Sequence, residues 1–387
     1  MYWILCDSYV LYDPRLSDLF VLEPILTQKK NEPGELTFKI PKEHPNYGVL
    51  EKLKSRIKVY RDDTLIWIGR AIEDERDLYE NRKIFAEGAL SFLLDSVMRP
   101  FSFEGTATEL FTSILAEHNA QVNDNQKLIL GNCDTSGSVS LSNKDYLSSW
   151  QALKTCLFDS FGGYLIVRFD ENENPILDYL SDVSDTSTQR IEFGENLIGL
   201  ALSRSASETY TACVPLGAAL QDIDSESESD ARLTIESVND GQETLINLAL
   251  AAEYGVIFAP TASTTWDEIT DANILINRGR DWLSGTGARF KQTIKLSAVD
   301  LHNADANVES FQFLDKVVVS CGTLCPEETY VLSELTIPLN NPASTGIVLG
   351  DSRPSLIGEE VRQNSSVKNR IESIEADYTT HGEIKEI

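Results

Sequence analysis

The chain has 387 residues, of which 42% are hydrophobic, enough to fill several cores and to exclude wholesale disorder. A chain of this length is expected to form roughly two to four domains. Its 33 basic and 61 acidic side chains give a formal net charge of −28. Because DNA is a polyanion and the sequence has no basic stripe with interleaved aromatic residues, we expect no sequence-specific or tight binding of nucleic acid.

No stretch approaches the roughly 20 apolar residues needed to cross a bilayer. The first residues, MYWILCDSYV, lack a basic leader, so we expect neither a membrane segment nor a secretory signal. The cysteines are scattered, and the pair Cys321 and Cys325 has neither zinc-knuckle spacing nor a second pair beside it. We therefore expect reduced, mostly buried thiols in a protein made in a cytoplasm.

Residues 1–98 predict a first β module of short antiparallel strands. Leu36, Phe38 and Ile40 alternate with polar neighbours, as expected for strands with one buried face. Turn-forming residues separate the segments that have this pattern. The expected strands lie at 36–40, 57–60, 65–69 and 84–88.

Residues 99–188 predict an α+β domain. Thr106 and Glu109 have the spacing of a capping box at the start of a helix. That helix has its apolar residues on one face, namely Leu110, Phe111, Ile114 and Leu115. A second helix is expected to start near 142–145 and to bury Tyr146, Trp150, Leu153 and Leu157. A hairpin of strands at 164–169 and 175–180 completes the domain.

The tip of this hairpin, Asp170 to Asn174, begins like a calcium-binding loop. Such a loop needs Gly at its sixth position and a bidentate Glu at its twelfth. The chain has Pro175 and Ser181 there. We therefore predict a polar β-turn.

A second β module is expected to be interrupted by an insert. The acidic segment 221–230 has five carboxylates and no basic residue, so we expect a solvated connector. After it we expect a strand at 233–235 and a helix from about 270–271 that uses Ile274, Leu275, Trp282 and Leu283, with Trp266 in the same core. The β pattern resumes at Phe290.

The two β modules resemble each other. The segment from Ser55 to Tyr60 matches the pattern from Asp315 to Ser320, and each is followed by a turn, a long apolar strand and a short strand that ends at Gly88 or Gly350. The expected organisation is a first β module at 1–98, an α+β domain at 99–188, a second β module at 189–220 and 286–351, an inserted α/β domain at 221–285, and a C-terminal helix or tail at 352–387.

The C-terminal segment leaves two interpretations open. Ile357, Asn364, Val367, Ile371, Ile374 and Tyr378 have a spacing like the a and d positions of a coiled coil. The segment is either a short three-stranded stalk or a single helix or tail on its own subunit, because fewer than four heptads do not decide between them.

An enzyme is not expected. The four histidines, His44, His118, His302 and His381, have no Cys, Ser or carboxylate at a recognised spacing, and the sequence has no HExxH, G-x-S-x-G or glycine-rich phosphate loop. His44 fits a turn, and His118 lies at a helix end, where a cation interacts favourably with the helix dipole. We predict no catalytic, cofactor-binding or metal-binding residues and no cofactor.

Several segments resemble phage tail-tip proteins of the prophage endopeptidase-tail or tail-associated-lysozyme family, which is related to baseplate hub proteins. In the first module these are Gly34 to Pro41, His44 to Tyr47, Ser55 to Tyr60, Ile68 to Arg70, Ala86 to Gly88 and Phe92 to Ser96. Later segments follow in the same order, at Ile191 to Leu197, Thr211 to Gly217, Leu233 to Gly241, Ala298 to Leu301 and Leu349 to Gly350. The likeness spans most of residues 1–351.

The resemblance implies a mainly β fold with α+β parts, made of two tube-like β-barrel domains and two α/β domains. It implies a homotrimer at the virion tail tip, in which six similar domains surround a lumen. Its partners would be the distal tail protein ring, the tail tube and the tape-measure protein, with DNA passing without specific binding. Longer relatives carry a peptidoglycan-cleaving domain, for which we expect no room in these 387 residues.

Three further interpretations stay open. The insert residues Trp266, Trp282, Tyr254 and Phe258 are candidates for binding cell-wall carbohydrate, although core packing explains them equally well. The chain also fits a hub from a phage-derived secretion or killing particle. The acidic surface suits a conduit through which a polyanion passes, or it keeps the protein soluble.

Overall fold

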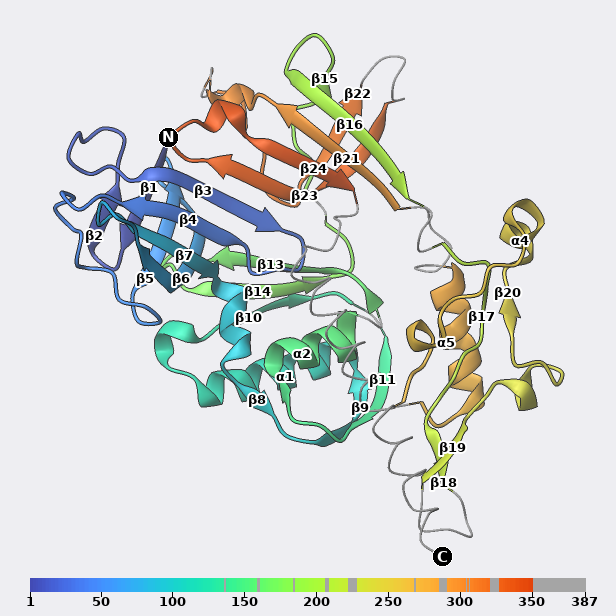
Figure 1. Cartoon of the computed structure of the whole chain (residues 1–387). Coiled ribbons are helices and arrows are strands. Elements are labelled where there is room, and N and C mark those ends of the chain that lie inside the picture. Colours follow the sequence, from blue (N-terminus) through green and yellow to red (C-terminus); the bar gives the residue numbers. More distant parts are fainter. Residues whose placement is uncertain are drawn as a thin grey trace, which may run out of the picture. The chain divides into compact units, whose positions relative to one another are not determined.

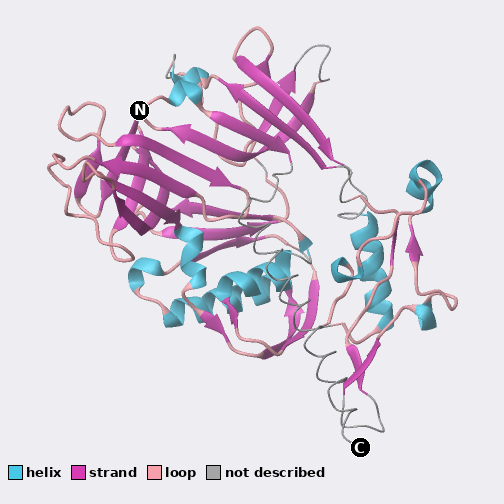
Figure 2. Cartoon of the chain, in the orientation of Figure 1, coloured by secondary structure: helices cyan, strands magenta, loops and turns pink. Residues whose placement is uncertain are grey.

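The computed structural model describes residues 1–350 except 136, 159–160, 184, 206–208, 222–227, 268, 285–290, 304, 306 and 321–326. The predicted C-terminal segment 352–387 and the pair Cys321 and Cys325 lie outside the described residues. In the described part, no helix has the length and apolar character needed to span a bilayer. Figures 1 and 2 show the arrangement of the elements.

The first β module is built from antiparallel strands that bury alternate residues. In β4 the buried residues are Leu36, Phe38 and Ile40, as the alternation predicts. The strands are β1 (Tyr2–Cys6), β2 (Tyr9–Tyr12), β3 (Leu22–Lys29), β4 (Glu35–Ile40), β5 (Arg56–Arg61), β6 (Thr64–Arg76) and β7 (Arg82–Gly88). A 3-10 helix, η1 (Ala89–Leu94), leads out of the module.

The α+β part packs two helices against short strands around a core of its own. Its elements are β8 (Val97–Met98), β9 (Phe101–Thr106), α1 (Ala107–Gln121), η2 (Asp124–Gln126), β10 (Ile129–Cys133), β11 (Ser138–Asn143), β12 (Leu147–Ser148), α2 (Ser149–Leu153), η3 (Lys154–Phe158), β13 (Tyr164–Phe169) and β14 (Pro175–Leu180). The capping box of Thr106 and Glu109 is confirmed, because both of its hydrogen bonds form. The predicted hairpin is confirmed as β13 and β14.

The predicted start of the second helix was wrong. Helix α2 begins at Ser149, because Ser148 and Gln151 form a second capping box there. Residues Ser138–Asn143 pair with β9 as strand β11 instead. Tyr146 therefore lies before the helix and is 72% exposed, whereas Leu153 and Leu157 are buried as expected.

The second β module and its insert follow. The module comprises β15 (Ile191–Glu192), β16 (Leu197–Ser205), β21 (Lys291–Ala298), η7 (Leu301–Asn303), β22 (Lys316–Ser320), β23 (Glu328–Pro338), η8 (Pro342–Ser344) and β24 (Gly346–Gly350). Between β16 and β21, where the insert is predicted at 221–285, the chain forms β17 (Ala212–Cys213), β18 (Ala219–Gln221), β19 (Glu228–Arg232), η4 (Glu236–Val238), β20 (Leu245–Ile246), α4 (Leu248–Tyr254), η5 (Thr261–Ser263) and α5 (Ala272–Ser284).

Three expectations for the insert need correction. Residues 233–235 are not a strand, because the strand ends earlier, at Arg232, where β19 pairs with β18. That pairing makes the end of the acidic segment part of a hairpin, while 222–227 lie outside the described residues. Helix α5 buries Leu275 and Leu283, but its Ile274 is 53% exposed.

The two β modules share one sheet and one core. Thirteen strands form this sheet, in which the order β16-β21-β24-β23-β3-β4-β7-β6-β5-β1-β2 runs through both modules. One cluster of buried residues contains Ile4 and Phe38 from the first module together with Val317 and Leu349 from the second. The predicted mainly β fold with α+β parts is confirmed. The predicted closed barrels are not confirmed, because the path of paired strands in the described residues has two ends. The domain boundaries stay predictions.

Candidate functional site

The predicted repeat is present in the strand order and register. Strands β3-β4-β7-β6-β5 of the first module correspond to β16-β21-β24-β23-β22 of the second, and all neighbours in both series are antiparallel. One row of paired residues crosses the first series through Leu26, Leu36, Ala86 and Ala71. The equivalent row in the second series is Leu202, Ile294, Leu349 and Leu332.

Irregular features repeat at matching places as well. A bulge lies between Ala71 and Glu73 in β6 and between Leu332 and Glu334 in β23. Just before β5 and β22, Leu53 and Leu314 both have positive φ, of 62° and 72°. The N–H of Leu53 donates to the Ala71 carbonyl over 2.9 Å, and that of Leu314 to the Leu332 carbonyl over 3.1 Å. Irregularities of this kind do not coincide by chance, so the chain contains a structural duplication.

The two modules join through one ladder. Strand β23 pairs with β24 on one side and with β3 of the first module on the other. The β23–β3 ladder runs antiparallel from Glu334 opposite Lys29 to Pro338 opposite Ile25. Opposite charges therefore face each other where this ladder begins.

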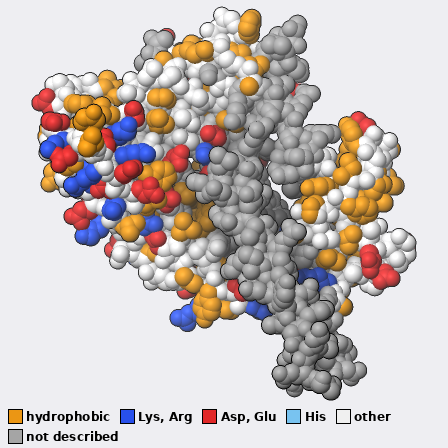
Figure 3. Space-filling view, viewed as in Figure 1, with side chains coloured by type: hydrophobic (Ala, Val, Ile, Leu, Met, Phe, Trp, Pro, Cys, Tyr) orange, Lys and Arg blue, Asp and Glu red, His pale blue; other side chains and the backbone are white. Residues whose placement is uncertain are grey.

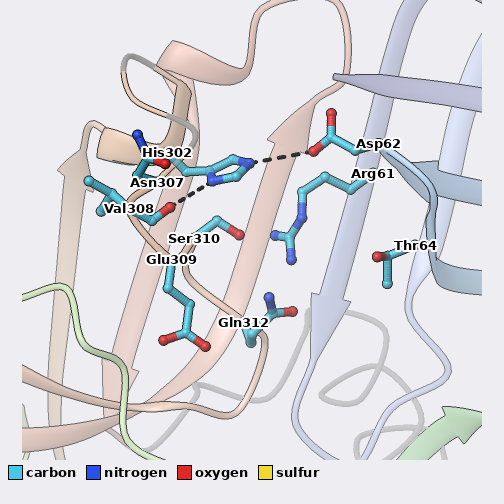
Figure 4. A pocket seen from close by; sticks show the side chains of 9 residues that line it. All are labelled: Arg61, Asp62, Thr64, His302, Asn307, Val308, Glu309, Ser310 and Gln312. Carbon is cyan, nitrogen blue, oxygen red and sulfur yellow. Dashed lines mark hydrogen bonds and ion pairs between the residues drawn. The ribbon is translucent and has the colours of Figure 1, made fainter.

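A polar pocket of about 280 Å³ is lined by residues of both modules, from the β5–β6 turn and from the segment before β22, as Figure 4 shows. Asp62 accepts a hydrogen bond from the N-terminal amine over 2.7 Å and lies 3.4 Å from Nε2 of His302. The other ring nitrogen of His302 lies 2.7 Å from the Val308 carbonyl. Arg61 donates to the carbonyl of Phe311 over 3.2 Å. The contacts of Asp62 with His302 and of Arg61 with Phe311 link the β5–β6 turn of the first module to the segment before β22.

The buried carboxyl group of Asp315 contacts Gln312, a residue that lines the pocket. It is 7% exposed, and one of its oxygens accepts the N–H of Gln312 over 2.9 Å. Burial raises the pKa of Asp315 to about 6, with Asp185 and Glu309 adding to the rise and Arg61 opposing it. The equivalent residue in the first module is Ser55, whose hydroxyl accepts the N–H of Glu51 over 3.1 Å. The neutral hydroxyl of Ser55 therefore accepts a backbone N–H group, as Asp315 does, but without carrying a charge.

We expect Asp315→Ser to stabilise the protein at neutral pH. Because the folded state prefers the protonated carboxyl, Asp315 lowers stability as the pH rises from its ordinary pKa of 3.8 to about 6. This rise in the pKa of Asp315 corresponds to a loss of roughly 3 kcal/mol at most in the free energy of unfolding above pH 6. Urea unfolding at pH 4 and pH 7 checks this against the exposed control Asp63→Ser. Equal pH dependence in Asp315→Ser and the parent protein would contradict it.

The predicted turn at the β13–β14 tip is confirmed, and it also holds two parts of the chain together. Asp170 accepts the N–H groups of Asn172 and Asn174, both over 2.8 Å, and so closes the turn. Glu173 points out of it to β5, where its carboxylate accepts bonds from Lys58 over 2.5 Å and Tyr60 over 2.6 Å. The turn therefore anchors the α+β part on the first β module.

We expect Glu173→Ala to lower the free energy of unfolding by about 1–3 kcal/mol. The change leaves Lys58 and Tyr60 without their acceptor, although partial exposure of Glu173 moderates the loss. Lys58 and Tyr60 lower the pKa of Glu173, so its contribution is lost as the pH falls through that lowered value. Urea unfolding at pH 7 measures the effect against Glu171→Ala, which changes an exposed residue of the same turn. Equal midpoints for the two variants would rule out the anchor.

The three histidines in the described part of the chain each contact a backbone carbonyl group. Nε2 of His44 lies 2.8 Å from the Leu11 carbonyl, and Nδ1 accepts the N–H of Asn46, which confirms the predicted turn. The expectation of a cationic His118 was wrong. His118 is fully buried, burial lowers its pKa, and its nitrogens contact Ser96 and the carbonyl of Gln126. His302 lines the pocket, and His381 lies outside the described residues.

The structure separates the four candidate aromatic residues of the insert. Trp266 is 8% exposed in the insert core, and Trp282 packs against that core and stacks on Tyr210. Tyr254 and Phe258 are 43% and 50% exposed. Hydrophobic side chains gather around α4 in Figure 3, and the exposed ones include Ile246, Leu248, Val256 and Ile257. Among the described residues, no group of His, Cys, Asp and Glu has the arrangement of a metal site.

Comparison with solved structures identifies the fold. Prophage tail protein gp18 from Listeria monocytogenes EGD-e has a TM-score of 0.56 and 13% identity, over 95% of this chain and 99% of that chain. A tail protein from Neisseria meningitidis MC58 has a TM-score of 0.59 and 10% identity, over 91% and 96%. The 43 kDa tail protein of prophage MuSo2 from Shewanella oneidensis has a TM-score of 0.56 and 12% identity, over 91% and 98%.

No protein-family model and no curated protein matches the sequence. The chain therefore shares its fold, over nearly its full length, with tail proteins from three bacteria, two of which are prophage tail proteins. At 10–13% identity this likeness defines the fold.

Proposed function

We propose that the chain is a structural subunit of a phage tail tip, a baseplate hub that closes the distal end of the tail tube as a homotrimer. The observation that carries the proposal is the duplicated five-strand series, which gives each subunit two equivalent β modules. Three copies supply six such modules, which suit the end of a tube with sixfold symmetry. The fold shared with prophage tail proteins supports the same conclusion.

In this proposal the two β modules are the tube-like domains that surround the lumen. The hub docks on the distal tail protein ring, continues the tail tube, and opens to let DNA or the tape-measure protein pass. A net charge of −28 suits a wall past which a polyanion moves without specific binding. The site of action is the virion tail tip, after synthesis in the cytoplasm of the bacterial host.

Two experiments test the proposal. Size-exclusion chromatography with light scattering is expected to give three times the mass of the chain. Negative-stain images of assembled tails labelled with an antibody against the chain are expected to show the label at the distal tip. A label along the tube or on the capsid would refute the assignment.

We also propose that the chain is not an enzyme. The described histidines contact backbone carbonyl groups, and His302 also lines the polar pocket. None of these contacts joins a histidine to an exposed nucleophile. A zymogram with bacterial cell walls is expected to show no clearing. Clearing by the purified chain would overturn this part of the proposal.

A second candidate function is host recognition at the tail tip. The exposed rings of Tyr254 and Phe258 favour it, because sugar-binding sites commonly present aromatic side chains. Co-sedimentation of the full chain with purified bacterial cell walls tests it, with the double variant Tyr254→Ser and Phe258→Ser for comparison. Binding that the double variant abolishes supports recognition, and absence of binding removes it.

A further inference from the structure

The two duplicated modules differ in what lies along two of their strand edges. In the second module, the ladder between β22 and β23 ends at Val331, and β3 occupies the same side of β23 from Glu334 onward. In the first module, the ladder between β5 and β6 ends at Arg70. Beyond it, Glu73 to Arg76 pair with β7 alone in the described part of the chain.

A second edge is open at the other end of the sheet. Strand β16, the equivalent of β3, pairs with β21 on one side and has no strand on its outer side among the described residues. The terminal strand β2 differs, because the side chains of His44 and Asn46 already contact the carbonyls of Leu11 and Val10. Side chains placed in this way protect a sheet edge from further pairing.

The two open edges are the counterparts of the two strands that pair inside the chain. Strand β6 corresponds to β23, and β16 corresponds to β3. We infer that β6 of one copy pairs antiparallel with β16 of the next copy, and so repeats between copies the junction that β23 and β3 form within each copy. This inference rests on the proposed ring of copies, and it assigns the contact between neighbouring copies to the edges of β6 and β16.

The internal ladder also fixes the register of the ladder between copies. The matched bulges align Glu334 with Glu73, and the matched rows align Leu26 with Leu202. The pairs between copies are then Glu73 with Ser205, Asp74 with Arg204, Glu75 with Ser203, and Arg76 with Leu202. Pairing in this register is heterologous, so it does not stop at a twofold dimer, and it forms a closed ring when the rotation between successive copies closes.

The charges of the two edges are complementary by sequence. Residues 73–75 of β6 are all acidic; Glu73 and Glu75 are exposed, whereas Asp74 is already paired with Arg82 within the chain. Strands β16 and β21 contain Arg204, Lys291 and Lys295 and no carboxylate, although the chain as a whole carries 61 acidic residues. Two copies with a net charge of −28 repel each other, so an edge without acidic residues is where another copy is best accommodated.

Cysteine cross-linking of the full chain tests the register. In the double variant Glu75→Cys and Ser203→Cys, mild oxidation is expected to form disulfides between copies, seen as a ladder of covalent oligomers on non-reducing gels. The matched positive control is Thr336→Cys with Thr27→Cys, which lie opposite each other within one copy and should cross-link internally. In Glu75→Cys with Arg204→Cys the register shifts by one residue and places the thiols on opposite faces. The single-cysteine variants report any background from the native cysteines.

The outcomes separate this inference from the proposed function. A covalent ladder in the double variant, absent from the shifted pair and from the single variants, supports the inference. A trimer by light scattering without that cross-link overturns the β6–β16 pairing and leaves the trimeric hub standing. A chain that stays monomeric at every concentration and forms no cross-link overturns both.

Discussion

Arg82→Met is expected to lower the free energy of unfolding by about 3 kcal/mol, because it leaves the partly buried carboxylate of Asp74 and two backbone carbonyl groups without their donor. The Arg82 side chain is 6% exposed and binds Asp74 over 2.8 and 3.2 Å. It also donates to the carbonyl groups of Tyr47 and Leu50. Urea unfolding followed by tryptophan fluorescence measures the loss.

The control for this change is Arg76→Met, an exposed arginine near the same hairpin turn. It is expected to change stability by less than about 0.5 kcal/mol. Arg82 lowers the pKa of Asp74, so the contribution of the pair is lost as the pH falls through that lowered value. The difference between the parent protein and Arg82→Met should therefore shrink in acid. Equal losses for the two variants at pH 7 would contradict the role of Arg82.

Phe111→Ala is expected to cost about 3–5 kcal/mol, through the lost burial of the ring and the cavity that it leaves. Phe111 is fully buried in the core of the α+β part, and its ring lies 5.8 Å from that of Tyr179. The exposed end of the same helix, with its intact capping box, is not affected by the change. Urea unfolding followed by circular dichroism measures the loss.

Phe111→Leu is the matched control, because it retains most of the apolar volume. Its expected cost is below about 1.5 kcal/mol. A comparable loss for both variants would mean that the aromatic contact with Tyr179, and not the cavity, dominates.

The features that the sequence predicted are local ones. The alternation of Leu36, Phe38 and Ile40 defined β4, and Thr106 with Glu109 defined the start of α1. The strand patterns also predicted the duplication, because Ser55 and Asp315 each precede a strand with alternating buried residues. These signals depend on residues close together in the chain, where side-chain spacing and capping chemistry decide the structure.

What the sequence did not predict depends on distant residues. Nothing in the spacing of β3 and β23 shows that they pair across about 300 residues of chain, because register between strands is set by the whole sheet. The sequence suggested a cation at a helix end for His118, but the folded chain buries its ring beside Ser96, and burial lowers its pKa. The anchor of Glu173 was missed for the same reason, since Lys58 and Tyr60 lie more than 100 positions earlier. The only sequence signal for it is an acidic residue at a hairpin tip.

The insert enters the second module between β16 and β21, at the position where the first module has only the short turn from β3 to β4. One half of the duplication thus acquired about 85 additional residues without a change in its strand order. In a closed ring of such subunits, modules with the insert would alternate with modules that lack it. The inner wall would then have twice the rotational order of the periphery, which allows a sixfold channel to present threefold attachment points outside.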